Sequence, residues 1–272
     1  MLRSLNTAVS GLQYQQNRLD VIGNNIANVN TTGFRAATTH AADNFSSILN
    51  ARSQVGSGVH LASTTNSFTQ GVISGTGQPY DMAIEGNGFF TVKDPVTNEM
   101  FATRAGDFRL DRDGKLVTQE GYLVQGLDAT GAAGDITISL ATGVPDGYHG
   151  VSWRIADNGQ VKLTVEPNTP GGPRLDPVTI GQIQVQNFRD PGALTKVGNN
   201  LFSNLDLASP EGLGTPGIGG RGSLQWQALE QSNVDLAGQF TDLIVTQRGY
   251  QANAKIITTS DEILQEMINL KR

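Results

Sequence analysis

The sequence contains no cysteine in 272 residues and few charged residues of either sign. The absence of cysteine excludes disulfides, thiolate metal sites and cysteine nucleophiles. Only 16% of the residues are charged, and 19 Lys and Arg against 25 Asp and Glu give a formal net charge of −6. Nucleic-acid-binding surfaces need clustered Lys and Arg. No basic block occurs, so we do not expect nucleic acid as a partner.

Long apolar runs and clustered histidines are missing as well. No run of 18 apolar residues occurs, so no membrane-spanning helix is expected. The histidines His40, His60 and His149 lie too far apart in the sequence for the close spacings of a metal site. The stretch from Met1 to Val9 contains Arg3 and no unbroken apolar segment, which argues against a cleaved secretory leader. We therefore expect a cytosolic chain, or one exported without such a leader.

The sequence does contain a seven-residue apolar repeat at each end. Such a repeat keeps an apolar stripe facing a partner helix along its whole length. We predict one helix from residue 2 to about 29 and another from Ser232 or Asn233 to the end, which meet each other or neighbouring copies. The predicted self-assembly residues are Leu5, Leu12, Leu19, Ile22 and Ile26, and Leu236, Phe240, Leu243, Tyr250, Ile257 and Leu264.

Polar residues interrupt these stripes. Gln15 and Gln247 occupy positions where an apolar residue is expected. They indicate either a wetter stretch of helix or buried polar residues that set register or partner choice. The outward face of the first helix is rich in Ser, Thr, Asn and Gln and poor in charge, which favours packing among copies over exposure to solvent.

Between the two ends the apolar period changes to two, which indicates β-strands. The clearest hairpin spans 153–165, because Asn158-Gly159 supplies the positive φ angles of a tight turn. A connector with a short helix around Phe45 to Leu49 is expected before the strands, and the Gly- and Pro-rich residues 206–223 indicate an irregular segment. The predicted fold class is α+β. Its expected parts are a terminal helical domain (1–33 and 232–272), an extended connector (34–82 and 189–231) and a mainly antiparallel β domain (83–188).

Motifs for chemistry are weak. Residues 217–222 match a dinucleotide-binding pattern, but Pro210 and Pro216 precede them and the required strand-to-helix context is missing. Residues 111–114 resemble the start of a calcium loop, yet position twelve is Tyr122, which cannot supply a carboxylate. No nucleophile has a base attached to it by motif. We expect no enzyme activity, no cofactor and no metal.

Several motifs carry a family resemblance. Residues 20–28, with Asn24, Asn25 and Asn28, are followed by Gly33 and Phe34 and resemble the N-terminal signature of flagellar rod and hook proteins. The tail, with Ser232-Asn233-Val234-Asp235-Leu236 and residues 246–253, is similar to the C-terminal helix of the same family. Residues 83–90 and 103–108 resemble the β-region shared by hook and distal-rod proteins. The resemblance covers about 1–126 and 180–272.

The resemblance implies a structural subunit of the bacterial flagellar axial tube, in the rod or hook of the basal body. In that family the two terminal helices pair antiparallel as a coiled coil, with the β domain outside them. Subunits leave the cell unfolded through the flagellar export apparatus, without a cleaved signal peptide. The implied partners are copies of the chain, other flagellar axial proteins and that apparatus. The C-terminal residues 258–272 resemble those of hook proteins, whereas the length of the chain is closer to that of rod proteins. The choice between hook and rod therefore stays open.

Two other classes of function remain as hypotheses. One is a soluble binding module, in which the β domain binds a ligand and the helices serve as an oligomerisation stalk. The other is an enzyme that uses Asp107, Asp111 and Asp113 as paired acids or metal ligands. The favoured hypothesis is mechanical: the chain polymerises into a helical tube that transmits torque and lets exported subunits pass.

Overall fold

The structure is a computed structural model that describes residues 2–44, 47–50, 53–140, 144, 148–168 and 175–270. The fold is α+β, and every strand pairing among the described residues is antiparallel. The chain forms two compact units. The terminal unit comprises Met1–Val29, Arg35–Phe68 and Val234–Arg272, and the β unit comprises Asn30–Phe34 and Thr69–Asn233.

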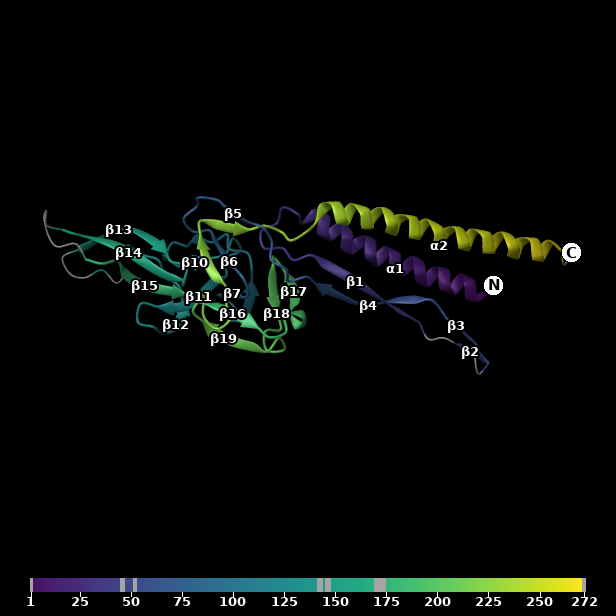
Figure 1. Ribbon diagram of the computed structural model, residues 1–272, viewed down its shortest axis with the longest axis horizontal. Coiled ribbons are helices and arrows are strands. Elements are labelled where there is room, and N and C mark those ends of the chain that lie inside the picture. The colour runs from purple at the N-terminus through teal and green to yellow at the C-terminus, as the bar shows by residue number, and fades with distance from the viewer. Residues whose placement is uncertain are drawn as a thin grey trace. The chain divides into compact units, whose positions relative to one another are not determined.

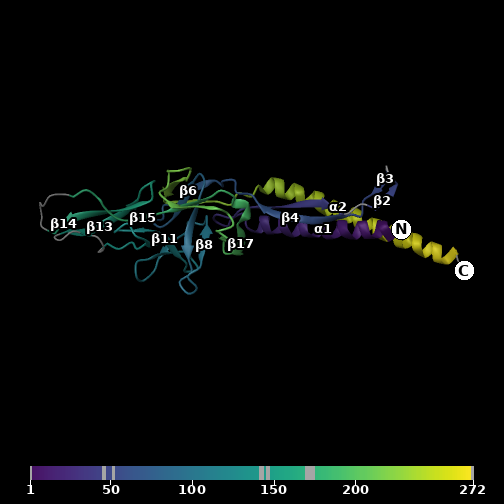
Figure 2. The ribbon, with the colours of Figure 1, turned by 90° about the horizontal axis from the view of Figure 1, so that it is seen from below.

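Two helices dominate the terminal unit. Helix α1 spans Leu2–Ala27 and helix α2 spans Leu236–Leu270. They run antiparallel, and Figures 1 and 2 show them side by side. Helix α2 begins after Asp235, whose carboxylate accepts a hydrogen bond from the amide of Ala237 at 3.1 Å. The start expected at Ser232 or Asn233 is therefore wrong. No helix among the described residues is long and apolar enough to cross a membrane.

A β-hairpin lies beside α1 in the same unit (Figures 1 and 2). Strand β1 (Ala37–Asp43) pairs with β4 (Val59–Asn66), and β2 (Ser47–Asn50) pairs with β3 (Ser53–Val55). Thr-rich pairs such as Thr38 with Thr65 favour this ladder, because β-branched side chains fit a pleated sheet. The expected extended connector thus contains two pairs of strands here, and the short helix expected at 47–49 is wrong; Phe45 and Ser46 lie outside the described residues.

The β unit is built around one large sheet. Its central path runs in the order β13-β14-β15-β11-β7-β8-β18-β17, and β16 joins β7 to β19. Short pairs β20–β6 and β21–β5 complete the unit. The strands are β5 (Ile73–Gly75), β6 (Met82–Glu85), β7 (Phe89–Lys93), β8 (Met100–Thr103), β9 (Arg109–Leu110), β10 (Leu116–Val117), β11 (Leu123–Asp128), β12 (Ala133–Asp135), β13 (Tyr148–Ile155), β14 (Gln160–Pro167), β15 (Val178–Ile183), β16 (Val185–Phe188), β17 (Thr195–Gly198), β18 (Leu201–Ser203), β19 (Pro210–Gly214), β20 (Ser223–Trp226) and β21 (Ala228–Glu230).

The hydrophobic core lies within this unit. Residues from most strands contribute, among them the fully buried Phe90, Leu163 and Ile183. The hairpin expected at 153–165 is confirmed: β13 pairs with β14, and Gly159 turns between them at φ +80°. The segment 206–223, expected to be irregular, contains the short strand β19 and the first residue of β20, and its other residues form turns and irregular structure. Its glycines shape turns between short strands, as Gly217 does at φ +79° between β19 and β20.

Candidate functional site

Polar and small residues form the contact line between α1 and α2. Asn25 Nδ2 donates to Gln239 Oε1 at 3.0 Å, and Arg18 Nη2 lies 2.8 Å from Asp242 Oδ1. Two glycines, Gly11 and Gly249, receive amide side chains from the opposite helix, as built Cβ atoms show. A Cβ on Gly11 would lie 2.7 Å from Asn253 Nδ2, and one on Gly249 would lie 2.6 Å from Gln15 Nε2. We name this contact line the polar seam: Gly11, Gln15, Arg18 and Asn25 on α1, with Gln239, Asp242, Gly249 and Asn253 on α2.

The buried residues of α2 lie on the same face of the helix as the polar seam. Thr246 is 0% exposed and Ser260 is 8% exposed, and both lie seven residues from Asn253. Their hydroxyls donate to Asp242 and Ile256 carbonyls of the same helix, so their burial leaves no unpaired donor. Helix α2 therefore presents a stripe of small and polar residues toward α1.

The predicted apolar residues flank this line. On α1, Ile22 is buried, and Leu5, Leu12, Leu19 and Ile26 are half-buried. On α2, Leu243, Ile257 and Leu264 are half-buried, whereas Leu236, Phe240 and Tyr250 are exposed. Of the two interrupting glutamines, Gln15 lies in the seam and Gln247 is exposed. The structure thus leaves much of the apolar surface of α2 uncovered within one chain.

The motif residue Asn25 has a specific role in the terminal unit. It is 1% exposed and binds Ala37 of β1 as well as Gln239. Its neighbours in the motif lie at the end of the helix: Asn28 Nδ2 donates to the Asn24 carbonyl at 2.9 Å. The asparagines of this motif therefore have two roles. Asn28 binds the last turn of α1, and the buried Asn25 links α1 to β1 and α2.

The motif residues Gly33 and Phe34 belong to the β unit. Gly33 has φ +67°, and its amide donates to the Glu230 carbonyl at 2.8 Å. A Cβ at Gly33 would lie 2.6 Å from the Arg104 carbonyl carbon and the Ala105 amide nitrogen, so only glycine fits. The Phe34 ring lies under Lys196, whose Nζ is 4.2 Å from the ring centroid.

A buried ion pair lies next to Gly33. Arg104 Nη1 is 3.1 Å from Glu230 Oε2, and the two side chains are 5% and 0% exposed. Arg104 also donates to the carbonyls of Ile84 and Gly86, and Glu230 Oε1 accepts from the Gly71 amide at 2.8 Å. Sequence reasoning missed Glu230, because no local pattern distinguishes it from a surface acid.

Comparison with known proteins covers both units. Three family models match: "Flagella basal body rod protein" at residues 5–35, "Flagellar hook protein FlgE/F/G D1 domain" at 83–163 and "Flagellar basal body rod FlgEFG protein C-terminal" at 225–270. The flagellar basal-body rod protein FlgG of Bacillus subtilis is 39% identical over 287 positions that cover 100% of both chains. The chain belongs to the flagellar rod and hook protein family. FlgG of Caulobacter vibrioides is 36% identical over 99% of this chain and 100% of its own length.

Membership of the flagellar rod and hook family identifies a structural axial subunit of the flagellum, not an enzyme. Burial raises the pKa of Asp107, and the charges of Glu120 and Asp81 add to the effect. Among the described residues, no three His, Asp or Glu side chains come together as a metal site.

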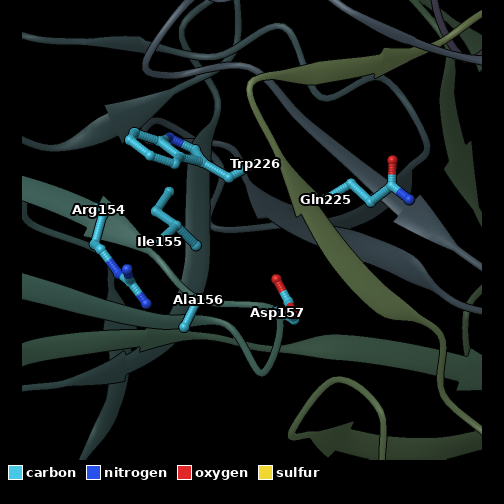
Figure 3. A pocket seen from close by; sticks show the side chains of 6 residues that line it. All are labelled: Arg154, Ile155, Ala156, Asp157, Gln225 and Trp226. Carbon is cyan, nitrogen blue, oxygen red and sulfur yellow. The ribbon is translucent and has the colours of Figure 1, made fainter.

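The β unit of this flagellar protein has a shallow pocket of about 420 Å³. Figure 3 shows its lining of Arg154, Ile155, Ala156, Asp157, Gln225 and Trp226. Two of its polar groups already have partners, since Trp226 Nε1 donates to the Pro79 carbonyl and Gln225 Nε2 donates to Glu85. The pocket is therefore largely a surface hollow between β13 and β20.

Proposed function

We propose that this chain is a rod subunit of the flagellum that polymerises into a helical tube, transmits torque and lets exported subunits pass. The terminal unit is the part that builds the tube, and α1 and α2 act as an antiparallel coiled coil. In this proposal residues 1–33 and 232–272 work as the tube-forming domain, residues 83–188 as the outer β domain, and 34–82 and 189–231 as the segments that connect them. The partners are copies of the chain and other axial proteins.

The lengths of the relatives support a rod subunit over a hook subunit. Rod relatives align with this chain over 287 positions and across 100% of their own length. The flagellar hook protein FlgE of Borreliella burgdorferi is 27% identical, and its alignment extends over 443 positions while covering 100% of both chains. The hook relative therefore contains long segments with no counterpart among the 272 residues of this chain.

The uncovered apolar face of α2 is the single observation that carries polymerisation. Phe240, Ile244, Val245, Ile256 and Ile263 are between 44% and 58% exposed. Burial of such residues stabilises an assembly by about 25 cal/mol for each Å² of apolar surface removed from water. A contact between this face and a different surface of the next copy is heterologous and does not close, so it generates a helical filament.

The polar seam also supports folding coupled to assembly. A helix pair whose contact line consists of polar residues and glycines, such as Thr246 and Gly11, removes little apolar surface from water, so it is weakly stable alone. We propose that the ends of the chain are largely disordered during export, without a cleaved leader, and fold as copies assemble. Limited proteolysis of dilute monomer tests this: residues 1–30 and 235–272 are cut first. Protease resistance of these ends in the monomer contradicts the proposal.

Charged substitutions in the half-buried apolar residues test the tube itself. Leu12→Glu and Leu243→Glu place a carboxylate where neighbouring helices pack, so we expect loss of motility and of assembled rods. The matched controls are Leu12→Met and Leu243→Met, which change the same positions but keep an apolar side chain of similar volume. Normal rods in the two leucine variants contradict the proposal.

Electron microscopy of cells that lack the chain tests the subtype. A rod subunit predicts basal bodies that end within the rod, with no hook attached. Intact rods without hooks would instead indicate a hook subunit. Intact flagella would refute an axial role for this chain.

A further inference from the structure

The polar seam has one fixed register. Gln15 lies against Gly249, and four residues earlier in α1 Gly11 lies against Asn253, four residues later in α2. Ten residues beyond Gln15, Asn25 binds Gln239, ten residues before Gly249. These three contacts are equally spaced on both helices, so they describe a single antiparallel alignment.

The apolar stripes do not determine that alignment. The leucines and isoleucines of α1 recur every seven residues from Leu5 to Ile26. The apolar series of α2 recurs in the same way from Leu236 to Leu264, with Tyr250 at its centre. A slide of one helix by seven residues, about 10 Å at 1.5 Å per residue, brings apolar residues opposite apolar residues again. The buried apolar area is therefore nearly the same in both registers.

The polar seam contains a different residue pair at each position along the helices, so a slide changes its contacts. Moving α2 by seven residues brings Ile256 opposite Gln15 and Ser260 opposite Gly11. The space above Gly249 no longer receives the Gln15 amide, and Asn25 no longer reaches Gln239. The slide therefore breaks the hydrogen bond between the buried Asn25 and Gln239. At Gln15 the conflict is steric, because the Ile256 side chain takes the place where Gly249 leaves space.

We propose that the polar seam selects the register of α1 against α2, with the two glycine–amide pairs as its main determinants. This proposal rests on the proposed function, because the register sets the height at which the outer apolar face of α2 meets the next copy. Glycine supplies the space for an amide only at positions 11 and 249, so the correct alignment is the one that fills both spaces.

Cysteine pairs report the register without background, because the chain has no cysteine of its own. The pair Ser4→Cys with Ser260→Cys lies seven residues beyond Gly11 and Asn253, so it joins the helices in the observed register and leaves the polar seam intact. The pair Ser4→Cys with Met267→Cys joins them only after a slide of seven residues. Each pair is placed in the full chain, and disulfide yields are measured in isolated rods and in dilute soluble chain.

The decisive variant moves the glycine by one heptad. Gly249→Ile combined with Ile256→Gly keeps the composition and offers Gln15 its space one heptad later. With the natural seam we expect an excess of about tenfold of the 4–260 disulfide over the 4–267 disulfide. In the moved-glycine variant we expect the 4–267 disulfide to dominate. The control Ile256→Gly alone introduces the same flexible residue, keeps Gly249 and retains the 4–260 disulfide.

Three results would overturn the proposal: equal yields of the two disulfides with the natural seam, no disulfide at 4–260, or a 4–260 excess that survives the moved glycine. Failure of the proposed function gives a different result. In that case the dilute chain still forms the 4–260 disulfide, but the chain is absent from isolated rods. A chain present in rods without a register preference refutes only the role of the seam.

Discussion

Asn25 binds Ala37 through both backbone polar groups of that residue. Its Nδ2 donates to the Ala37 carbonyl at 2.8 Å, and its Oδ1 accepts from the Ala37 amide at 2.9 Å. The same Nδ2 donates to Gln239 Oε1 at 3.0 Å. One buried side chain of α1 therefore holds the first residue of β1 and the second turn of α2.

Removal of this amide should destabilise the terminal unit. Asn25→Ala leaves the amide and carbonyl of Ala37 without these partners, and we expect a loss of about 2–4 kcal/mol. Hydrogen exchange of the Ala37 amide in isolated rods measures it, because local opening sets the exchange rate. Asn17→Ala removes an exposed amide from the same helix and should change stability by less than about 0.5 kcal/mol. Equal effects of the two variants would contradict the role of Asn25.

Loss of Glu230 should destabilise the β unit. Glu230→Ala leaves the buried Arg104 guanidinium without its carboxylate, which costs about 3–5 kcal/mol in buried pairs. Thermal unfolding of the full chain measures the shift. Glu99→Ala removes an exposed carboxylate from the same unit and should leave the unfolding temperature almost unchanged. An equally small shift for Glu230→Ala would show that the pair contributes little.

The two glycines Gly33 and Gly77 separate backbone strain from steric clash. Both have positive φ, +67° and +71°, but a Cβ on Gly77 meets nothing within 4 Å. Gly77→Ala should therefore cost only the left-handed backbone penalty of about 1–2 kcal/mol. Gly33→Ala adds a clash with the Arg104–Ala105 backbone and should cost clearly more. Denaturant unfolding of both variants tests the difference, and equal costs would mean that the backbone around Arg104 yields easily.

Asp135 should contribute a stability that depends on pH. Burial alone raises its pKa, but the hydrogen bond from Gln125 and the charges of Lys115 and Lys93 outweigh this and hold the pKa below the ordinary value of 3.8. A lowered pKa stabilises the folded state above pH 3.8, and that contribution is lost as the pH falls through the lowered value. Asp135→Asn should cost up to about 1 kcal/mol at pH 7 and progressively less in acid. A pH-independent cost in denaturant titrations would exclude this account.

Asp107 should behave in the opposite way. Its pKa is raised by burial first and by Glu120 and Asp81 next, so ionisation disfavours the folded state. The free energy of unfolding therefore falls as the pH rises from the ordinary value of 3.8 through the raised one. Asp107→Asn should stabilise the protein at pH 7 and lose this advantage below about pH 4. Unfolding titrations at several pH values measure it, and a loss of stability at pH 7 would refute the sign.

Local patterns in the sequence predicted local structure. The Asn158-Gly159 turn predicted its hairpin, because the positive φ angles are a property of two residues. The C-terminal helix followed from its apolar period in the same way. The β1–β4 hairpin was missed, because its Thr- and Ala-rich strands lack an apolar alternation.

Contacts between distant residues were not predictable from one sequence. Arg104 and Glu230 are 126 residues apart, and nothing local identifies them as partners. The polar seam was not predicted from the sequence for another reason. The apolar repeat indicated which residues share a helix face, but the contact partner of that face depends on the alignment of two helices 214 residues apart at Asn25 and Gln239. The self-assembly residues therefore stay a prediction.

The segments that lead into and out of the β unit gather at Glu230. Its carbonyl accepts from Gly33 and its carboxylate from Gly71, and the chain leaves the unit a few residues later, at Asn233. A unit whose ends are fastened at one point is modular, because loops far from that point can lengthen without disturbing the fastening. Loops of the β unit can therefore be enlarged while the terminal unit keeps its own fold.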